Sequence, residues 1–375
     1  MKIFINIDKR KTICIIHSIM KYFSFTLILL LLFYNNIECI QSLFPQDTNS
    51  NTQFVTISAV GDIMMGSDFP NPILPPSSGK YLFDNVKEHF NTNIVFGNLE
   101  GPFCIGGYTN KNIESGKTYA FRTPPVYASN LAKAGFNCLS LANNHIMDFG
   151  IRGIMTTLNT LDSLKIQHSG QRGDIARFNI NGLKVGLIAF STYNSTYNIL
   201  EESEAYSTIR SLSDSFDILI VSMHAGVEGI KALHTKNKFE YFYGEARGNV
   251  IRFSHKAIEN GADLILGHGP HIPRAMEIYK DRLIAYSLGN FCPYGRFSLR
   301  GATSKSFILK VKLNSNGSFN SGNIVPIDIK KPGIPYIDTT IYIIKLIQEL
   351  SKEDFNGNQL RIDNDGNIFQ NKSGI

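Results

Sequence analysis

The feature that most constrains the fold is a short apolar run that ends abruptly in a polar cluster. Residues 138–142 are apolar except for one serine, and residues 143–148 then bring two asparagines, a histidine and an aspartate. Periodicity alone does not separate a buried strand from a buried helix, but the turn glycine Gly135 before the run and the helical period after Gly150 favour a strand. In open α/β sheets, ligands bind where such strands end. The alternative is a loop with capping amides.

Apolar, β-rich runs alternate with helical patterns along the rest of the chain. Further strands are predicted at 54–60, 94–96, 184–190, 217–223, 262–266 and 283–287. Helices are predicted at 81–86, 124–134, 151–161, 201–212, 244–260 and 340–350. This alternation is typical of βαβ units and predicts an α/β fold. After Ser306, alternating apolar residues predict a closing antiparallel strand at 307–313 that pairs with 324–329.

The predicted strands end in side chains that can bind a cation. These are Asp62, Glu100, Asn144 with His145, His224, His268 with His271, and Asn290. One such residue is more often a hydrogen-bonded cap than a ligand, but so many at one sheet edge make coincidence a weak explanation. Imidazole, carboxylate and amide ligands without cysteine suit Mn, Fe or Zn. We therefore predict a site for one or two divalent ions, with Asp62, Glu100, Asn144, His224, His268 and His271 as ligands.

Two divalent ions at such a site would share a bridging carboxylate, clamp a phosphoryl or carbonyl oxygen and lower the pKa of a bound water. His145 follows Asn144 directly, and adjacent side chains leaving a strand point apart, so His145 is predicted to face the substrate as a catalytic acid. Asp148 is predicted to fix its tautomer. The alternative is that His145 only caps the following helix. Substrate binding is assigned to Asn98, Asn143, Glu228 and Asn290.

Charge and cysteine content exclude two classes of protein. The formal charge is +6, but the first 42 residues carry five basic and two acidic side chains, which leaves 32 and 29 in the remainder. That balance is too mild for a nucleic-acid-binding protein, so no nucleic-acid partner is expected. The five cysteines are too few and too scattered for a disulfide scaffold.

The N-terminal region has the pattern of a targeting segment. Lys21 precedes an uncharged apolar run that is short for a membrane span, which predicts a secretory signal peptide or an uncleaved anchor within residues 1–41. Residues 42–53 are polar and suit a spacer. Residues 54–330 are predicted to form the folded domain, and 331–375 a C-terminal tail with one helix. The expected location is extracytoplasmic: secreted, periplasmic or anchored in the cell envelope.

Six motifs follow one another in a fixed order between about residues 55 and 329. They are Gly61-Asp62, Gly97-Asn98-Leu99-Glu100, Ala142-Asn143-Asn144-His145 with Asp148 and Gly150, His224-x-Gly226-x-Glu228, Gly267-His268-Gly269-Pro270-His271, and Tyr286-Ser287-Leu288-Gly289-Asn290-Phe291. Together they resemble the CapA-type capsule biosynthesis proteins, which are bacterial proteins of poly-γ-glutamate capsule assembly within the calcineurin-like metallophosphatase superfamily. The resemblance implies a four-layer α/β/β/α sandwich of two mixed sheets.

The resemblance also implies roles for single residues. Asp62 matches the first metal-binding aspartate of the superfamily, Asn144 and His145 match its Asn-His pair, and His224 matches its isolated histidine ligand. Three positions depart from the pattern. Met64 stands where a histidine is expected, Asn98 and Glu100 replace the second aspartate motif, and His268 and His271 are three residues apart instead of two. These departures are expected to weaken at least one of two metal sites.

Two function classes follow from these observations. The chain is either a metal-dependent, phosphoesterase-like hydrolase of an anionic polymer or phosphorylated envelope substrate, or a non-catalytic protein that binds metal or polymer and supports polyanion assembly or export. Either class implies contact with the membrane through the N-terminal segment and with capsule assembly proteins. A purely structural domain would leave the polar strand ends unexplained.

Overall fold

The computed structural model describes residues 53–115 and 118–371. The expected signal or anchor at 1–41 and nearly all of the spacer at 42–53 lie outside the described residues. Within the described ranges, no helix combines the length and the apolar character needed to cross a membrane.

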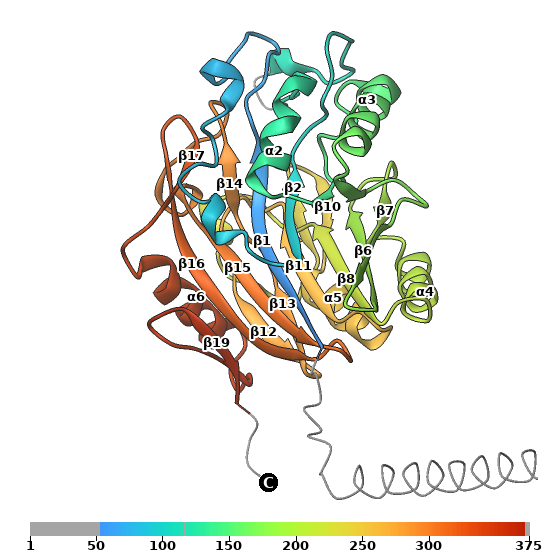
Figure 1. Ribbon diagram of the computed structural model, residues 1–375, viewed down its shortest axis with the longest axis vertical. Helices are drawn as coiled ribbons and strands as arrows, with labels where there is room; N and C mark the ends of the chain where they lie inside the picture. The colour runs from blue at the N-terminus through green and yellow to red at the C-terminus, as the bar shows by residue number, and fades with distance from the viewer. Residues whose placement is uncertain (1–52, 116–117, 372–375) are drawn as a thin grey trace, which may run out of the picture. The chain divides into compact units, whose positions relative to one another are not determined.

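The described chain is built around two large mixed sheets (Figure 1). The first sheet has the strand order β18-β19-β16-β15-β1-β2-β3-β4, with β14 beside β1 and β17 beside β16. Its strands are β1 (Phe54–Met64), β2 (Ile94–Leu99), β3 (Cys138–Ser140), β4 (Gln167–Ser169), β14 (Asn290–Pro293), β15 (Lys305–Asn314), β16 (Phe319–Lys330), β17 (Ile334–Ile337), β18 (Leu360–Ile362) and β19 (Asn367–Gln370). The predicted antiparallel pairing of 307–313 with 324–329 is confirmed by β15 and β16.

The second sheet has the order β12-β13-β11-β8-β6-β5, with β7 beside β6. Its strands are β5 (Ala176–Ile180), β6 (Leu183–Ser191), β7 (Tyr197–Asn198), β8 (Ile218–His224), β11 (Leu264–His268), β12 (Met276–Tyr279) and β13 (Arg282–Ala285). A separate hairpin consists of β9 (Glu240–Phe242) and β10 (Glu245–Gly248). In the second sheet, β6, β8, β11 and β13 run parallel, so the carboxyl ends of these strands lie at one edge of the sheet.

The main core lies between the two sheets. Apolar residues of β1 and β2, such as Ile57 and Phe96, pack in one cluster with residues of β8 and β11, such as Ile220 and Leu266. All four of these side chains are fully buried. The sheets therefore pack face to face through their inner surfaces.

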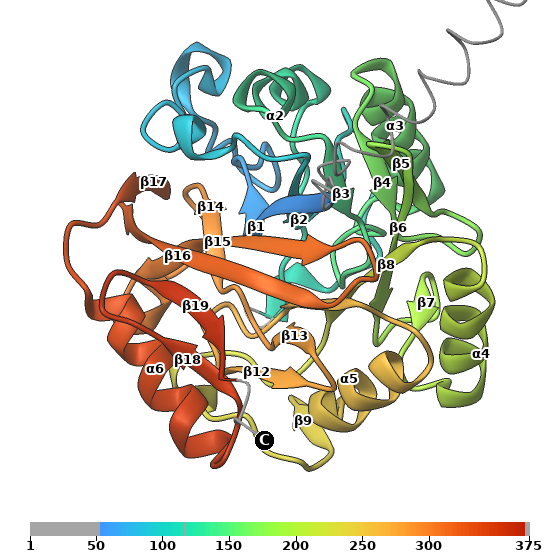
Figure 2. The ribbon, with the colours of Figure 1, turned by 60° about the horizontal axis from the view of Figure 1, so that its bottom comes forward.

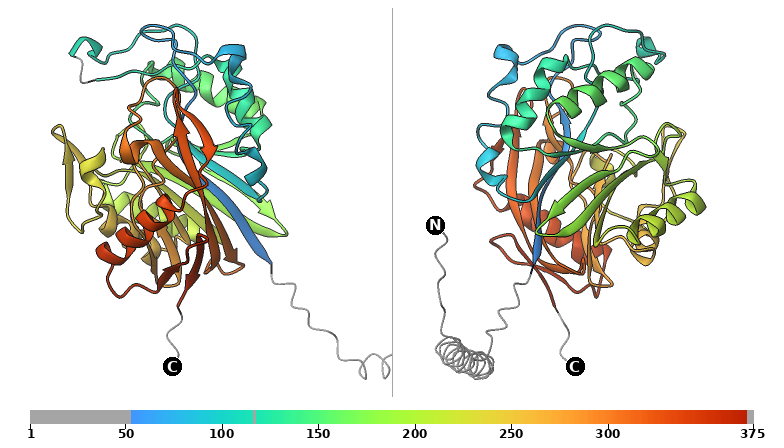
Figure 3. Two further views of the ribbon diagram at one scale, coloured as in Figure 1. Left: turned by 90° about the vertical axis from the view of Figure 1, so that its left-hand side faces the viewer. Right: turned by 45° about the vertical axis from the view of Figure 1, so that its right-hand side comes forward.

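Helices cover the outer faces of both sheets (Figures 2 and 3). Helices α2 (Ala128–Ala134) and α3 (Gly150–Ser163) pack on the first sheet, and α4 (Glu202–Ser213) and α5 (Val250–Glu259) pack on the second. The predicted α/β fold with four layers in the order α/β/β/α is thereby confirmed. Helix α6 (Tyr342–Asp354) instead contributes Ile343 and Ile347 to the core between the sheets.

Several predicted elements differ from the structure. Residues 81–86 form turns that lead into a short 3₁₀ helix at Lys87–His89. The helix predicted at 244–260 begins only at Val250, because Asn249 caps it by accepting a hydrogen bond from the Arg252 backbone N–H. The residues before it form strand β10. The segment beyond residue 330 contains the predicted helix, and β17, β18 and β19 also join the first sheet. Other 3₁₀ helices are Pro76–Gly79, Ile113–Ser115, Pro125–Tyr127, Ile230–Ala232 and Gly301–Ser304.

Candidate metal centre

The strand register brings polar residues of each sheet side by side. In the first sheet Asp62 of β1 pairs with Asn98 of β2 and with Asn290 of β14, all in parallel strands. In the second sheet His224 pairs with His268. The register shifts on both sides of Asp62, and such irregularities re-aim a side chain.

Gly61 permits the close approach of two chain segments next to Asp62. A Cβ atom at Gly61 would lie 2.0 Å from the carbonyl oxygen of Gly289. The same carbonyl accepts a 2.9 Å hydrogen bond from the Asp62 backbone N–H. The glycine in the Gly61-Asp62 motif therefore has a packing role that places the aspartate at the site.

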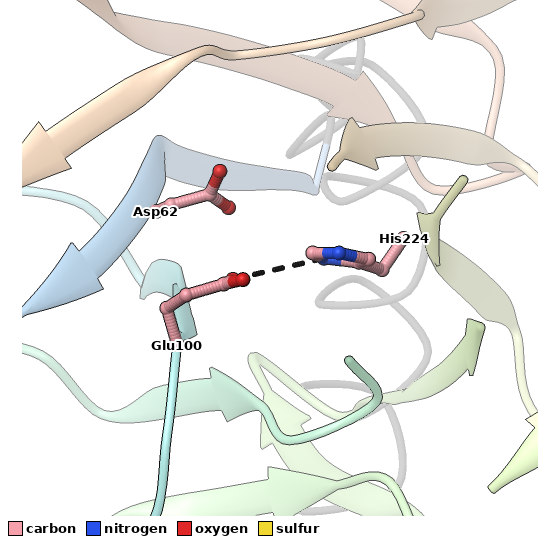
Figure 4. A group of neighbouring side chains, drawn as sticks. All are labelled: Asp62, Glu100 and His224. Atoms are coloured by element: carbon pink, nitrogen blue, oxygen red, sulfur yellow. Dashed lines mark ion pairs between the residues drawn. The ribbon is translucent and has the colours of Figure 1, made fainter. Parts of the chain in front are cut away.

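Asp62, Glu100 and His224 form what we call the ligand cluster (Figure 4). One potential ligand atom from each lies within 4.8 Å of the others. The three residues are 2%, 0% and 1% exposed, so they are shielded from bulk water. His224 Nδ1 is 3.7 Å from Glu100 Oε2, the pair joined in Figure 4. Two carboxylates and an imidazole brought together in a buried place can hold a divalent cation.

Several buried polar atoms at the ligand cluster have no hydrogen-bond partner, as expected where a metal ion fits. Glu100 Oε1, Asn144 Oδ1, His224 Nε2 and both ring nitrogens of His268 have no hydrogen-bond partner among the described residues. His268 Nδ1 lies 3.3 Å from Asp62 Oδ1, but not in hydrogen-bonding geometry. Leaving such a group unsatisfied costs about 1–3 kcal/mol. Carboxylate, amide and imidazole donors of this kind fit an ion such as Mn²⁺, Fe²⁺ or Zn²⁺.

His271 approaches the ligand cluster from the loop after β11. Its Nδ1 lies 2.8 Å from Asp62 Oδ2, and its Nε2 lies 4.0 Å from Glu228 Oε2. Burial alone would lower the pKa of His271, but the hydrogen bond with Asp62 and the charges of Glu100 and Glu228 raise it to about 9. His271 is therefore a cationic partner of Asp62 in the metal-free protein.

Burial and neighbouring charges strongly shift the pKa values of the residues in the ligand cluster. Burial raises the pKa of Glu100 to about 8, with a further contribution from the nearby Asp62 carboxylate. Burial alone would also raise the pKa of Asp62, but the adjacent His268 and His271 hold it below its ordinary range. Burial lowers the pKa of His224 well below its usual value, so its imidazole is neutral and able to bind a metal.

The buried His145 and Asp148 and the half-buried Lys111 form a second arrangement, which we call the proton-transfer group. His145 Nδ1 lies 2.8 Å from Asp148 Oδ2, and Lys111 Nζ lies 2.5 Å from Asp148 Oδ1. Lys111 also donates to the backbone oxygen of Asn144 at 2.9 Å. The Asp148 carboxylate thus orients the ring, and the remaining nitrogen, Nε2, lies 3.9 Å from Glu100 Oε1.

The protonation state of His145 follows from its surroundings. Burial lowers its pKa below the ordinary value; Asp148 acts in the opposite direction, and Lys111 in the same direction as burial. The free protein therefore holds a neutral imidazole at neutral pH, with the Nδ1 proton on the Asp148 side. Acting as an acid, as the sequence predicts, requires that an anionic substrate first raise this pKa.

A pocket of about 680 Å³ opens beside both arrangements. Its walls include His145, Asn144, His271, Glu228 and Lys111, together with the aromatic residues Tyr119, Phe121, Tyr193, Phe242, Tyr243 and Phe297 and the cations Arg247 and Arg296. The rings of Phe121 and His145 lie 4.4 Å apart, and those of Phe297 and His271 lie 5.1 Å apart. A substrate in this pocket would contact His145 directly.

Of the four residues assigned to substrate binding, one lines the pocket and three do not. Glu228 lines the pocket and pairs with Arg247 at 2.8 Å. Asn98, Asn143 and Asn290 are fully buried and not among the wall residues. Asn290 donates to the Thr303 backbone oxygen at 3.2 Å. Lys111 and Phe121 could not be predicted from the sequence, because they come from irregular segments that carry no periodic signal.

The three cysteines of the described region are buried and free. They are Cys104, Cys138 and Cys292. No disulfide joins any two of them.

Comparison with known proteins identifies the family. The family profile described as "Bacterial capsule synthesis protein PGA_cap" matches residues 56–294. The "Capsule biosynthesis protein CapA" of Bacillus anthracis is 25% identical over 315 residues, covering 81% of this chain and 74% of that protein. The "PGA biosynthesis protein CapA" of Bacillus subtilis is 25% identical over 328 residues, covering 82% and 81%.

A solved structure also aligns with the chain. It is the 5'-nucleotidase precursor of Thermus thermophilus, which is 11% identical, with a TM-score of 0.39, and the match covers 80% of this chain and 59% of that one. The chain thus spans less than two thirds of that protein, and a TM-score of this size supports no inference about activity. The family profile covers more than half of the chain, and it contains Asp62, Glu100, His145 and His224. The chain therefore belongs to the family of bacterial capsule synthesis proteins described as PGA_cap.

Proposed function

We propose that this protein is a metal-dependent hydrolase that acts on an anionic polymer or phosphorylated substrate of the cell envelope. The observation that carries the proposal is the position of the ligand cluster beside the proton-transfer group. Glu100 is the link, because its Oε2 faces His224 at 3.7 Å and its Oε1 faces His145 Nε2 at 3.9 Å. An ion held by the cluster would lie close to the one ring nitrogen that can exchange a proton with a substrate.

Each part of the site has a distinct chemical task under this proposal. When bound, a divalent ion polarises a substrate oxygen and lowers the pKa of a bound water. His145 Nε2 takes up a proton or, once the substrate's negative charge has raised its pKa, delivers one to the leaving group. Asp148 holds the Nδ1 proton and the ring orientation. Lys111 neutralises Asp148 and places positive charge at the pocket wall.

The proposed substrate class is supported by the cationic side chains in the pocket wall and by the names of the relatives. Lys111, Arg247 and Arg296 line the pocket with aromatic side chains. Arg247 is already paired with Glu228 and Glu245, so Lys111 and Arg296 supply the less compensated charge. The relatives are named for capsule and PGA biosynthesis, which makes poly-γ-glutamate or a phosphorylated precursor the first substrates to test.

A non-catalytic accessory role in polymer assembly is the second candidate. The observation that favours it is Asn98, whose side-chain NH₂ donates to both Asp62 and Glu100 within the ligand cluster. An amide nitrogen is not a metal ligand, so the centre has fewer donors than its buried position could accommodate. Under this role the protein binds metal or polymer without turnover.

One experiment separates the two functions. The purified protein is loaded with Mn²⁺, Zn²⁺ or Fe²⁺, its metal content is measured, and hydrolysis of generic phosphoesters and of poly-γ-glutamate is followed beside the His145→Ala variant. Metal binding with turnover that His145→Ala abolishes supports the hydrolase. Metal binding without turnover on either substrate supports the accessory role, and absence of metal binding contradicts both.

We also propose an extracytoplasmic location, based on the apolar run within residues 1–41. A reporter that is active only outside the cytoplasm, fused after residue 375, tests the location. A fusion active only inside the cytoplasm would contradict the proposal.

A further inference from the structure

Asn98 lies within the ligand cluster with its side-chain nitrogen, not its oxygen, toward the carboxylates. Its Nδ2 is 2.8 Å from Asp62 Oδ1 and 2.5 Å from Glu100 Oε2. The same nitrogen lies 3.5 Å from His224 Nδ1. An amide NH₂ has two N–H donors and no lone pair to offer a cation. Each carboxylate therefore receives one hydrogen of Asn98.

The orientation of Asn98 follows from the partners of Asn143. An amide can be assigned either way round, so its hydrogen bonds decide which end is nitrogen. Asn143 Oδ1 accepts from the His145 backbone N–H at 3.0 Å, and its Nδ2 donates to the Leu99 carbonyl at 2.7 Å. Turning Asn143 over would set donor against donor and acceptor against acceptor. Two backbone groups therefore fix Asn143.

Asn143 in turn fixes Asn98. Its Nδ2 also donates to Asn98 Oδ1 at 3.0 Å, so that oxygen faces away from the cluster. Asn98 and Asn143 are 0% and 1% exposed, so these hydrogen bonds are shielded from bulk water. The relay from the His145 and Leu99 backbone through Asn143 therefore keeps the Asn98 NH₂ between Asp62 and Glu100.

The Asn98 NH₂ between Asp62 and Glu100 restricts the number of metal ions that the centre can hold. In a two-metal centre, ions about 3.5–4 Å apart act together, and a ligand shared between them must offer lone pairs to both at about 2 Å. Here the place between the two carboxylates holds N–H groups, whose positive hydrogens repel a cation. The second oxygen of the Asp62 carboxylate, Oδ2, is hydrogen-bonded with His271 Nδ1. The partnerless atoms Glu100 Oε1, Asn144 Oδ1, His224 Nε2 and both His268 ring nitrogens remain to bind an ion, but none of them is a carboxylate oxygen shared between Asp62 and Glu100.

We propose that Asn98 limits the centre to a single divalent ion and replaces a second ion as the group that joins Asp62 to Glu100. The proposal rests on the metal binding that the proposed function requires, and it deepens that function by setting its metal stoichiometry. Asn98 acts as a positioning residue, because it holds the carboxyl groups of Asp62 and Glu100 close together. Asn143 serves the same purpose by fixing Asn98.

The test counts metal ions in the full chain. The protein is loaded with excess Mn²⁺ or Zn²⁺ and freed of unbound metal, and ions per chain are measured by elemental analysis and by calorimetric titration. The unaltered protein is expected to bind one ion. The Asn98→Asp variant replaces the NH₂ by an oxygen of similar size and supplies a shared carboxylate, so it is expected to bind two. Electron paramagnetic resonance of the Mn²⁺ forms should show an isolated ion and a coupled pair, respectively.

Asn98→Leu is the matched control, since it has a similar volume but neither donor nor ligand atoms. It is expected to bind no more than one ion. Two ions in the unaltered protein or in Asn98→Leu would overturn the inference and leave the proposed function standing, as would a folded Asn98→Asp protein that binds only one. No ion in the unaltered protein would overturn both. If Asn98→Asp fails to fold, the counts for the unaltered protein and for Asn98→Leu still decide.

Discussion

The ligand cluster and the proton-transfer group are both buried, yet they differ in how their polar atoms are satisfied. Glu100 and His224 of the cluster keep atoms without hydrogen-bond partners. In the proton-transfer group, by contrast, Asp148 Oδ2 is hydrogen-bonded to the His145 ring and the Phe121 backbone N–H, and Asp148 Oδ1, which has no hydrogen-bond partner, forms an ion pair with Lys111 at 2.5 Å. Unsatisfied buried polar atoms indicate a place that a ligand completes, whereas a carboxylate fixed by several partners indicates side chains already positioned to act. The difference assigns metal binding to one arrangement and proton transfer to the other.

The largest effect is expected from removing a cluster ligand. Asp62→Asn and His224→Ala should each lose most of the bound metal and, with it, any turnover down to background, because a buried site with few donors cannot spare one. Elemental analysis beside an activity assay measures both. Asp84→Asn makes the same chemical change at an exposed surface pair with Lys87 and should change neither. Full metal occupancy in Asp62→Asn would remove Asp62 from the ligand set.

His145→Ala should separate the two arrangements most clearly. We expect unchanged metal content and a loss of roughly 10²–10⁴-fold in kcat, the usual contribution of a positioned acid or base. His89→Ala serves as the control, because His89 lies in the 3₁₀ helix Lys87–His89 and is not part of the pocket wall. Loss of metal in His145→Ala would make His145 a ligand and erase the distinction between cluster and proton-transfer group.

Metal affinity should increase with pH, because protons compete with the ion. Glu100, with a pKa raised to about 8, is protonated below that value, and His271, with a pKa raised to about 9, is cationic below it. Glu100 must lose its proton for the cluster to carry its full negative charge, and deprotonation of His271 removes the positive charge beside Asp62. Affinity should therefore rise by up to about tenfold per pH unit for each proton released as pH increases from 6 toward 9. Calorimetric titration across this range measures it, and a flat profile would contradict the assigned ligands.

Lys111→Met should give the smallest effect and act only on the proton-transfer group. Losing the cation removes a charge that lowers the pKa of His145, so the His145-dependent limb of the pH–rate profile should move to higher pH. We expect kcat to fall about tenfold, as changes in outer-shell partners commonly cause, with metal content unchanged. Lys133→Met, on the exposed surface of α2, is the matched control. An unshifted pH profile would show that Lys111 acts only as a structural tether.

The fold and the strand-end residues could be predicted from the sequence because they depend on periodic signals. Buried runs such as 217–223 predict strands, and the carboxyl ends of parallel strands in one sheet must meet, which is why Asp62 lies beside Asn98 and His224 beside His268. The expectation of a single sheet edge was wrong, because Asp62 and His224 come from different sheets and meet across the two. Lys111 could not be predicted, since it reaches Asp148 from an irregular loop. Strand β10 of the hairpin falls within the helix predicted at 244–260, and the sequence predicts no strand at β9, which brings Phe242 to the pocket.

The roles of the asparagines were also beyond sequence reasoning. Asn98 and Asn143 stand in motifs beside the predicted ligands and were assigned to substrate contact. The direction of Asn143 is set by hydrogen bonds with backbone groups at Leu99 and His145, and the direction of Asn98 is set by Asn143. Only the folded chain brings these groups within reach of one another. The motifs therefore do not reveal that these residues lie at the ligand cluster, away from the pocket wall, nor which end of each amide faces the carboxylates.

Anomalous X-ray diffraction from crystals loaded with Mn²⁺ or Zn²⁺ tests the central claim most directly. We predict an anomalous peak bound by Asp62, Glu100 and His224, with metal–ligand distances of about 2.0–2.2 Å. His145 should lie outside the coordination sphere, with its Nε2 facing the pocket. A peak elsewhere, or no peak in crystals equilibrated with excess metal, would contradict the assignment of the ligand cluster as the metal centre.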